Sequence, residues 1–181
     1  IFGGWSRANN QRSLSLFARS RYGVDEMDYP FFPQRDFTEF QALVLRNSGN
    51  DNGRSMLRDV VLTSLMEGSH LDIQAYRTVA SYLNGEYWGL YNLREKINEH
   101  YIASLHSLDP DEINIVERNG DVIHGTNETY QAMINFVAVN SLASETNYQQ
   151  VADQIDLDNF IQYYLAQIYF DNKDWPGNNI K

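Results

Sequence analysis

Residues 82–96, YLNGEYWGLYNLREK, carry the clearest local structural signal in this chain of 181 residues. The runs 76–83 and 86–94, on either side of Asn84-Gly85, are rich in tyrosine, valine, leucine and tryptophan, which favour strands. Asn and Gly both tolerate the positive φ angles of a type I′ turn, so this pair between two such runs predicts a β-hairpin. An antiparallel strand pair is therefore expected in the middle of the chain.

Shorter segments on both sides of the hairpin predict further strands and helices. Polar and apolar residues alternate over 11–18, and 40–45 is a short apolar run, so each segment predicts a strand. Apolar residues at helical spacing predict a helix from Arg54 to about Ser69. Further along the chain we expect a helix over 95–105, a hairpin over 112–124 with Asn119-Gly120 at its tip, and helices over 129–142 and 157–170. Strands thus precede helices without βαβ alternation, which indicates an α+β fold or two lobes.

Composition excludes several classes of function. The net charge of −10 argues against a protein that binds a nucleic-acid groove, because such proteins present a basic patch. There is no cysteine, so disulfides, zinc–thiolate sites and thiol nucleophiles are excluded. The histidines show neither an i, i+4 pair nor an HExxH pattern, which argues against a zinc enzyme. No apolar run is long enough to span a bilayer.

Residues 171–181, DNKDWPGNNIK, combine acids, a Trp-Pro-Gly turn and asparagines directly after an apolar segment. Asp174 and Asn179 have the D-x-x-x-x-N spacing of a protein-kinase catalytic loop, in which the aspartate orients the acceptor hydroxyl and the asparagine binds Mg²⁺. A turn at the C-terminus of a helix explains the same residues, because Asp, Asn, Pro and Gly all favour turns. The spacing alone favours that simpler interpretation.

Several arginines lie near glycines or at the ends of expected strands: Arg7, Arg12, Arg46 and Arg94. Guanidinium groups beside a glycine-rich backbone such as Gly3-Gly4 are suited to binding phosphate. Ordinary surface charge explains any one of these arginines by itself.

The loop from Ser48 to Asp59 has oxygen-bearing side chains at alternate positions, as a calcium-binding loop has. Its first position is serine, however, and its last is aspartate in place of a bidentate glutamate. An Asx-rich cap for the following helix explains the loop better.

The order of these features along the chain is the order found in a protein kinase. A glycine turn at Gly3-Gly4 comes first, and a strand ending in Arg46 follows where a kinase has its V-A-I-K lysine. A helix with the acids Asp59 and Glu67 occupies the position of helix C, and residues 94–96 (REK) follow the hairpin at a hinge-like point. A long helix then leads into the DNKD sequence.

Five stretches together resemble the spore-coat protein H (CotH) kinase family: GGWSR (3–7), QRSLSL (11–16), LVLRNSGND (43–51), YLNGEYWGLYNLREKI (82–97) and FDNKDWPGNN (170–179). The resemblance implies an α+β, protein-kinase-like fold with two lobes, strand-rich over about residues 1–95 and mainly helical over about 96–181. It also implies an atypical secretory-type kinase that uses ATP with Mg²⁺ or Mn²⁺ to phosphorylate Ser or Thr of bacterial proteins outside the cytoplasm or at the cell surface.

The resemblance assigns expected roles to individual residues. Asp174 is similar to the catalytic aspartate, and Asn179 is similar to a metal ligand. Residues expected around the nucleotide are Gly4, Arg7, Arg46, Arg94, Glu95 and Trp175. Arg46 departs from the usual lysine, so the geometry of phosphate binding is expected to differ. Trp175 is expected either to pack the loop onto the helical lobe or to shield the nucleotide from water.

A kinase also needs a second metal-binding aspartate further along the chain, and the sequence ends at Lys181 without one. We therefore expect the chain to be a fragment with little activity by itself, because the charge on the transferred phosphoryl group would be poorly neutralised. A non-catalytic, pseudokinase-like module that binds a nucleotide or a partner is the alternative. Carbohydrate binding or hydrolysis is a third hypothesis. The sequence does not indicate the oligomeric state.

Overall fold

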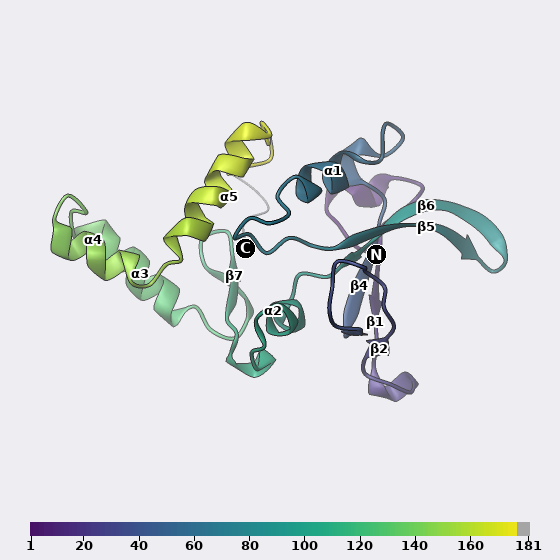
Figure 1. Ribbon diagram of the computed structural model, residues 1–181, viewed down its shortest axis with the longest axis horizontal. Coiled ribbons are helices and arrows are strands. Elements are labelled where there is room, and N and C mark those ends of the chain that lie inside the picture. Colours follow the sequence, from purple (N-terminus) through teal and green to yellow (C-terminus); the bar gives the residue numbers. More distant parts are fainter. Residues whose placement is uncertain (177–181) are drawn as a thin grey trace. The chain divides into compact units, whose positions relative to one another are not determined.

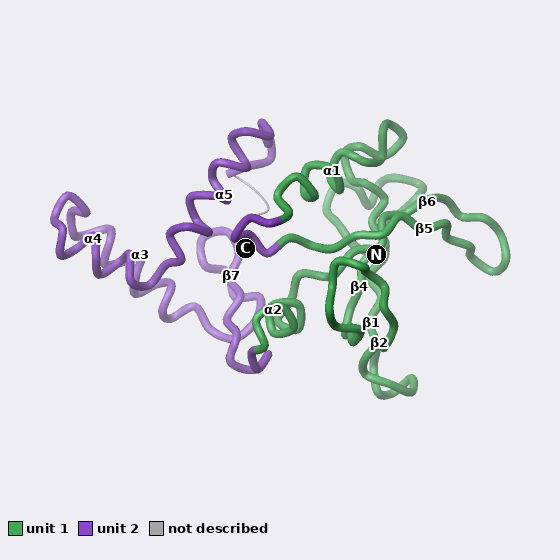
Figure 2. The backbone as a smooth tube through the Cα atoms, viewed as in Figure 1, with its two compact units in different colours: residues 1–67, 73–107 green, residues 68–72, 108–181 purple. Residues whose placement is uncertain are grey.

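The structure is a computed structural model that describes residues 1–176. The chain forms two compact units, shown in green and purple in Figure 2. Unit 1 contains residues 1–67 and 73–107, and unit 2 contains residues 68–72 and 108–181. The units are described separately below.

Unit 1 is built on a four-stranded antiparallel sheet with the strand order β1-β4-β6-β5. Its strands are β1 (Leu14–Phe17), β4 (Ala42–Arg46), β5 (Tyr76–Leu83) and β6 (Glu86–Glu95). The expected central hairpin is confirmed as β5 and β6, which form a long curved ribbon in Figure 1. Asn84 and Gly85 at its turn have φ angles of 52° and 85°, as a type I′ turn requires.

The aromatic segment between β1 and β4 packs against the sheet. It contains a short antiparallel pair, β2 (Met27–Asp28) with β3 (Glu39–Phe40), which periodicity did not predict. Phe32, Phe40, Leu43, Ala75 and Leu93 form a buried hydrophobic cluster in unit 1. Phe40 belongs to β3, so the strand expected over 40–45 begins two residues later than expected, at Ala42.

Helix α1 (Arg58–Ser64) is shorter than the helix expected over 54–69. Asp51 explains where it begins, because its Oδ2 atom accepts hydrogen bonds from the backbone N–H groups of Leu57 and Arg58, both at 3.2 Å. The Ser55 hydroxyl donates to the same oxygen and lowers the pKa of Asp51; burial opposes this effect and the N–H groups reinforce it. The loop thus acts as the expected Asx cap of the helix.

Helix α2 (Glu99–His106) follows β6. Its N-cap is Asn98, whose side chain accepts a hydrogen bond from the backbone N–H of Tyr101. The helix therefore begins later than the expected residue 95, because Glu95 still belongs to the strand.

Unit 2 contains a small hairpin and three helices. The hairpin pairs β7 (Ile115–Glu117) with β8 (Asp121–His124), as expected, although the positive φ angles at its tip belong to Arg118 and Gly120. The helices are α3 (Glu128–Val139), α4 (Glu145–Ala152) and α5 (Leu157–Tyr169). Helix α4 was not expected. In residues 1–176, no helix combines the length and the apolar composition needed to cross a membrane.

Candidate functional site

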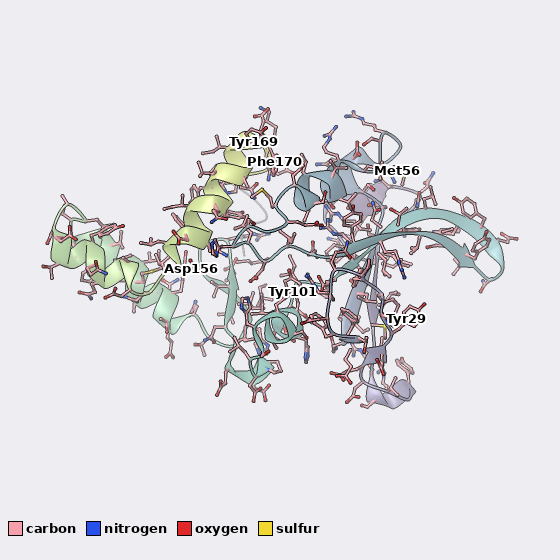
Figure 3. All side chains as sticks on the ribbon, in the orientation of Figure 1. Tyr29, Met56, Tyr101, Asp156, Tyr169 and Phe170 are labelled. Carbon is pink, nitrogen blue, oxygen red and sulfur yellow. The ribbon has the colours of Figure 1, made fainter. Side chains whose placement is uncertain are left out.

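The register of β4 and β6 places two of the predicted site arginines on one face of the sheet. Val44 pairs with Arg94, and Arg46 pairs with Asn92. Side chains two residues apart on a strand share a face, so Arg46 and Arg94 are diagonal neighbours on adjacent strands. Asn92 shows that the loop before α1 lies over this face, because its side-chain amide donates to the backbone carbonyl of Met56 at 3.0 Å. Figure 3 labels Met56 beside α1.

Asp59, in the first turn of α1, lies between these two cations. The Nε atom of Arg46 is 2.7 Å from Oδ2 of Asp59, and Nη1 of Arg94 is 2.5 Å from the same oxygen. Arg94 Nη2 also donates to the hydroxyl of Thr63, one turn further along α1, at 3.3 Å. We call Arg46, Asp59 and Arg94 the arginine–aspartate triad.

The charges of the triad keep Asp59 ionised. Burial by itself raises the pKa of Asp59, but the positive charges of Arg46 and Arg94 and their hydrogen bonds outweigh burial and hold the pKa below its ordinary value. Two guanidinium groups around one carboxylate leave a formal charge of about +1 on the triad. The triad is therefore electrostatically suited to an anion.

The two arginines differ in how much of each is accessible. The side chain of Arg46 is 35% exposed, whereas that of Arg94 is 2% exposed. Arg46 can therefore contact a ligand directly, while Arg94 offers almost no surface to one. The guanidinium of Arg46 also lies against Gly49, where an added Cβ would be 3.4 Å from its Nη2 atom.

Asn47, directly after Arg46, ties this strand end to the N-terminal glycine turn. It is fully buried, and its side-chain amide donates to the carbonyl of Gln11 at 2.6 Å and to that of Ser6 at 3.4 Å. Its side-chain oxygen accepts hydrogen bonds from the hydroxyl of Ser13 and from the backbone N–H of Gly49. Asn47 thus fixes both the N-terminal segment and the loop beside Arg46.

The N-terminal turn contains the predicted residues Gly4 and Arg7. Residues Trp5–Ala8 form a 3₁₀ turn, and the backbone N–H and Nε of Arg7 both donate to the carbonyl of Gly4. Arg7 is exposed. Because Asn47 binds Ser6 inside this turn, the turn is attached to the strand end that carries Arg46.

Glu95, the next residue after Arg94, points to the opposite face of the sheet. Its Oε1 atom accepts a hydrogen bond from Nε of Arg35 at 2.7 Å, and its Oε2 accepts one from the backbone N–H of Ala75 at 2.7 Å. Glu95 is buried, and the core cluster, with Leu43 and Leu93, lies on the same face. The structure therefore does not bring Glu95 together with the triad.

The remaining predicted residues lie in unit 2 or outside the described residues. Asp174 and Trp175 follow α5, and the backbone N–H of Asp174 donates to the side-chain oxygen of Asn172 at 3.1 Å. The ring of Trp175 meets that of Tyr164, on α5, edge to face with centroids 4.9 Å apart. Trp175 therefore packs this loop onto the helix, one of the two roles expected for it. Asn179 lies outside the described residues.

A family model described as CotH kinase protein matches residues 1–181, the whole chain. The chain belongs to the CotH kinase family. No curated protein and no solved structure matches it.

Membership of this kinase-like family suggests the use of ATP and a divalent metal in general terms. Within residues 1–176, no three or more His, Asp or Glu side chains gather into a metal-binding group. The donors in the DNKD loop, carboxylates and amides, are of the oxygen type that Mg²⁺ prefers, so their chemistry fits such an ion.

Two residues at the centre of this candidate site were not among the predicted site residues. Asp59 was expected only as an acid on a helix, and its exact partners depend on strand register, which the sequence does not show. Asn47 was expected only in a loop. The sequence could have indicated this role of Asn47, because a polar residue directly after the apolar run LVLR is placed to bind the backbone beyond the strand end.

Proposed function

We propose that this chain is a kinase domain that transfers the γ-phosphoryl group of ATP to Ser or Thr of a protein substrate. The observation that carries the proposal is the ion pair between Arg46, at the end of a sheet strand, and Asp59, on the helix over that sheet. Protein kinases require a comparable ion pair between the lysine of the V-A-I-K strand and a glutamate of helix C. Belonging to the CotH kinase family supports the same assignment.

In this proposal the exposed guanidinium of Arg46 binds the phosphates of ATP. A guanidinium presents several N–H donors in a fixed plane and can therefore bind two phosphate oxygens together, which a lysine ammonium does not do in the same way. Arg7 adds a second cation from the glycine turn that Asn47 attaches to the same strand end. The backbone at Gly4 lets the phosphates approach closely, because nothing lies within 4 Å of a Cβ added there.

Asp174 would accept a hydrogen bond from the acceptor hydroxyl and orient it toward the phosphorus atom, as the aspartate of a kinase catalytic loop does. Mg²⁺ or Mn²⁺, held by Asn179, would neutralise negative charge on the phosphate oxygens. We further propose that the substrates are proteins outside the cytoplasm or at the bacterial cell surface, on the family resemblance alone.

Phosphoryl transfer tests the proposal directly. The 181-residue chain, and any longer natural protein that contains it, would be incubated with labelled ATP, a protein acceptor and Mg²⁺ or Mn²⁺. Asp174→Asn keeps the shape of the side chain and removes the carboxylate. In whichever of these proteins transfers label, we expect Asp174→Asn to lower the rate at least about 100-fold, the range ascribed to a positioned acid–base group.

The other outcomes separate the alternatives. ATP binding without transfer by any of these proteins would favour the non-catalytic nucleotide-binding module. Neither binding nor transfer would contradict the proposed use of ATP. Equal transfer by the wild type and by Asp174→Asn would support a kinase and contradict the role given to Asp174.

A further inference from the structure

We infer that Arg94 is a positioning residue, which acts through Asp59 to fix the phosphate-facing side chain of Arg46. The inference concerns the arrangement of the triad. Only its effect on nucleotide affinity rests on the proposed function.

First, the direct pair of Arg46 with Asp59 is a weak constraint on both partly exposed side chains. Their side chains are 35% and 29% exposed. Ion pairs between partly exposed groups contribute little, because water screens the charges and both side chains lose freedom. By itself this pair would therefore not fix the direction of the Arg46 guanidinium.

Second, Arg94 is held by several hydrogen bonds at once. Its Nη1 atom binds Oδ2 of Asp59 at 2.5 Å, and its Nη2 donates to the Thr63 hydroxyl at 3.3 Å and to the carbonyl of Gln74 at 3.4 Å. The Thr63 hydroxyl in turn donates to the backbone carbonyl of Asp59 at 2.8 Å. Arg94 therefore binds two residues in successive turns of α1 and the segment that leads into β5.

Third, α1 depends on contacts with residues outside the helix. It has 7 residues, and its N-cap residue, Leu57, makes no side-chain capping bond. Helices this short are not stable by themselves in water. Asp51 binds the first turn from the loop, and Arg94 binds the same helix from the sheet. Removing Arg94 would free the Asp59 carboxylate, and with it the guanidinium of Arg46.

NMR spectroscopy of the ligand-free chain tests this arrangement without any assumption about activity. The variant is Arg94→Met, which keeps much of the side-chain length and removes the charge. Arg77→Met is the control, because Arg77 is an exposed arginine on the neighbouring strand β5. In Arg94→Met we expect the Nε–H signal of Arg46 to move and broaden, and the pKa of Asp59 to rise. The control should change neither.

If Arg94→Met does not fold, Arg94→Lys replaces it. Lysine keeps the buried positive charge but cannot contact Asp59, Thr63 and Gln74 from one planar group. We then expect Asp59 to stay ionised while the Arg46 signal still broadens. An unchanged Arg46 signal in a folded Arg94 variant would overturn the inference.

A double-mutant cycle, with the affinity for Mg·ATP as the measured quantity, tests whether Arg94 acts through Arg46. Arg94→Met, Arg46→Met and the double variant would be titrated by calorimetry. If Arg94 acts only through Arg46, each single variant weakens binding by about tenfold, and the double variant binds like Arg46→Met, since coupled residues are not additive. Additive losses would mean that Arg94 contacts the ligand directly, which would overturn the inference. If the wild type does not bind Mg·ATP, the proposed function fails, and the NMR result still decides the role of Arg94.

Discussion

Gly89 lies inside β6 with a φ of 135°, a conformation that residues with a side chain rarely adopt. A Cβ added there would be 2.7 Å from Nε2 of Gln11, which itself donates to the carbonyl of Leu90. The glycine therefore does two things: it allows the irregular backbone, and it leaves room for the side chain that joins the N-terminal segment to β6. The sequence shows the glycine in the middle of a strand but not its partner.

We predict that Gly89→Ala lowers the free energy of unfolding by about 1–3 kcal/mol, because the new methyl group meets both a strained backbone and Gln11. Urea unfolding measures the change. Glu86→Ala, at an exposed position of the same strand, is the control and should change the stability little. Equal stability of the two variants would show that the backbone at Gly89 adjusts freely.

At the scale of elements, turn residues and apolar periodicity predicted the hairpins and helices that depend on neighbouring residues in the sequence. Both Asn-Gly hairpins and the helices α3 and α5 were expected at nearly their observed positions. The β2–β3 pair was not, because it joins Met27 to Phe40 through only two paired residues on each strand. Helix α4 was missed because its sequence, ETNYQQVA, is mostly polar and has one buried residue, Val151. These elements depend on contacts that are distant in sequence or few in number.

The attachment of α1 to the sheet should depend on pH. Since the folded pKa of Asp59 lies below its ordinary value of 3.8, its ion pairs stabilise the fold above that pH. This stabilisation is lost as the pH falls through the folded pKa, because the unfolded chain then binds the proton more readily. At neutral pH, Asp59→Asn leaves Arg94 buried without its carboxylate and should lower the free energy of unfolding by about 3 kcal/mol.

We therefore predict that the difference in stability between the wild type and Asp59→Asn shrinks as the pH falls below 3.8. Chemical denaturation across that range measures it. Asp121→Asn, at an exposed position on β8, is the control and should differ little from the wild type at any pH. A difference that stays constant into acid would contradict the assignment of a lowered pKa to Asp59.

At the scale of the whole molecule, the chain divides in a way that the sequence does not reveal. Residues 68–72 belong to unit 2 although unit 1 continues after them. His70 explains the insertion: its backbone N–H donates to the side chain of Gln162, and its carbonyl accepts a hydrogen bond from Asn159, both on α5. Composition and periodicity do not show that a short segment between two parts of unit 1 belongs to unit 2. Whether the units are the lobes of a kinase stays a prediction.

If the two units unfold separately, damage to one core should spare the other. Leu43 is 1% exposed in the core of unit 1, and Leu43→Ala should cost about 2–5 kcal/mol. Native-state hydrogen exchange should show faster exchange in β4 and β6, with little change in α5. Leu83→Ala, at an exposed position near the tip of the hairpin, is the control. Equal loss of protection in α5 would show that the chain unfolds as one cooperative unit.

The opposite directions of Arg94 and Glu95 have a consequence for folding accuracy. A slip of β6 by one residue would turn every side chain of the strand to the other face. A slip in one direction would put Glu95 in the place of Arg94, against the carboxylate of Asp59. A slip in the other direction would put Arg94 in the place of Glu95, against the guanidinium of Arg35. Either slip would therefore replace an ion pair with a like-charged contact in poorly hydrated surroundings. Two neighbouring residues thereby penalise misaligned strand pairings, so the native alignment is favoured electrostatically as well as by apolar packing.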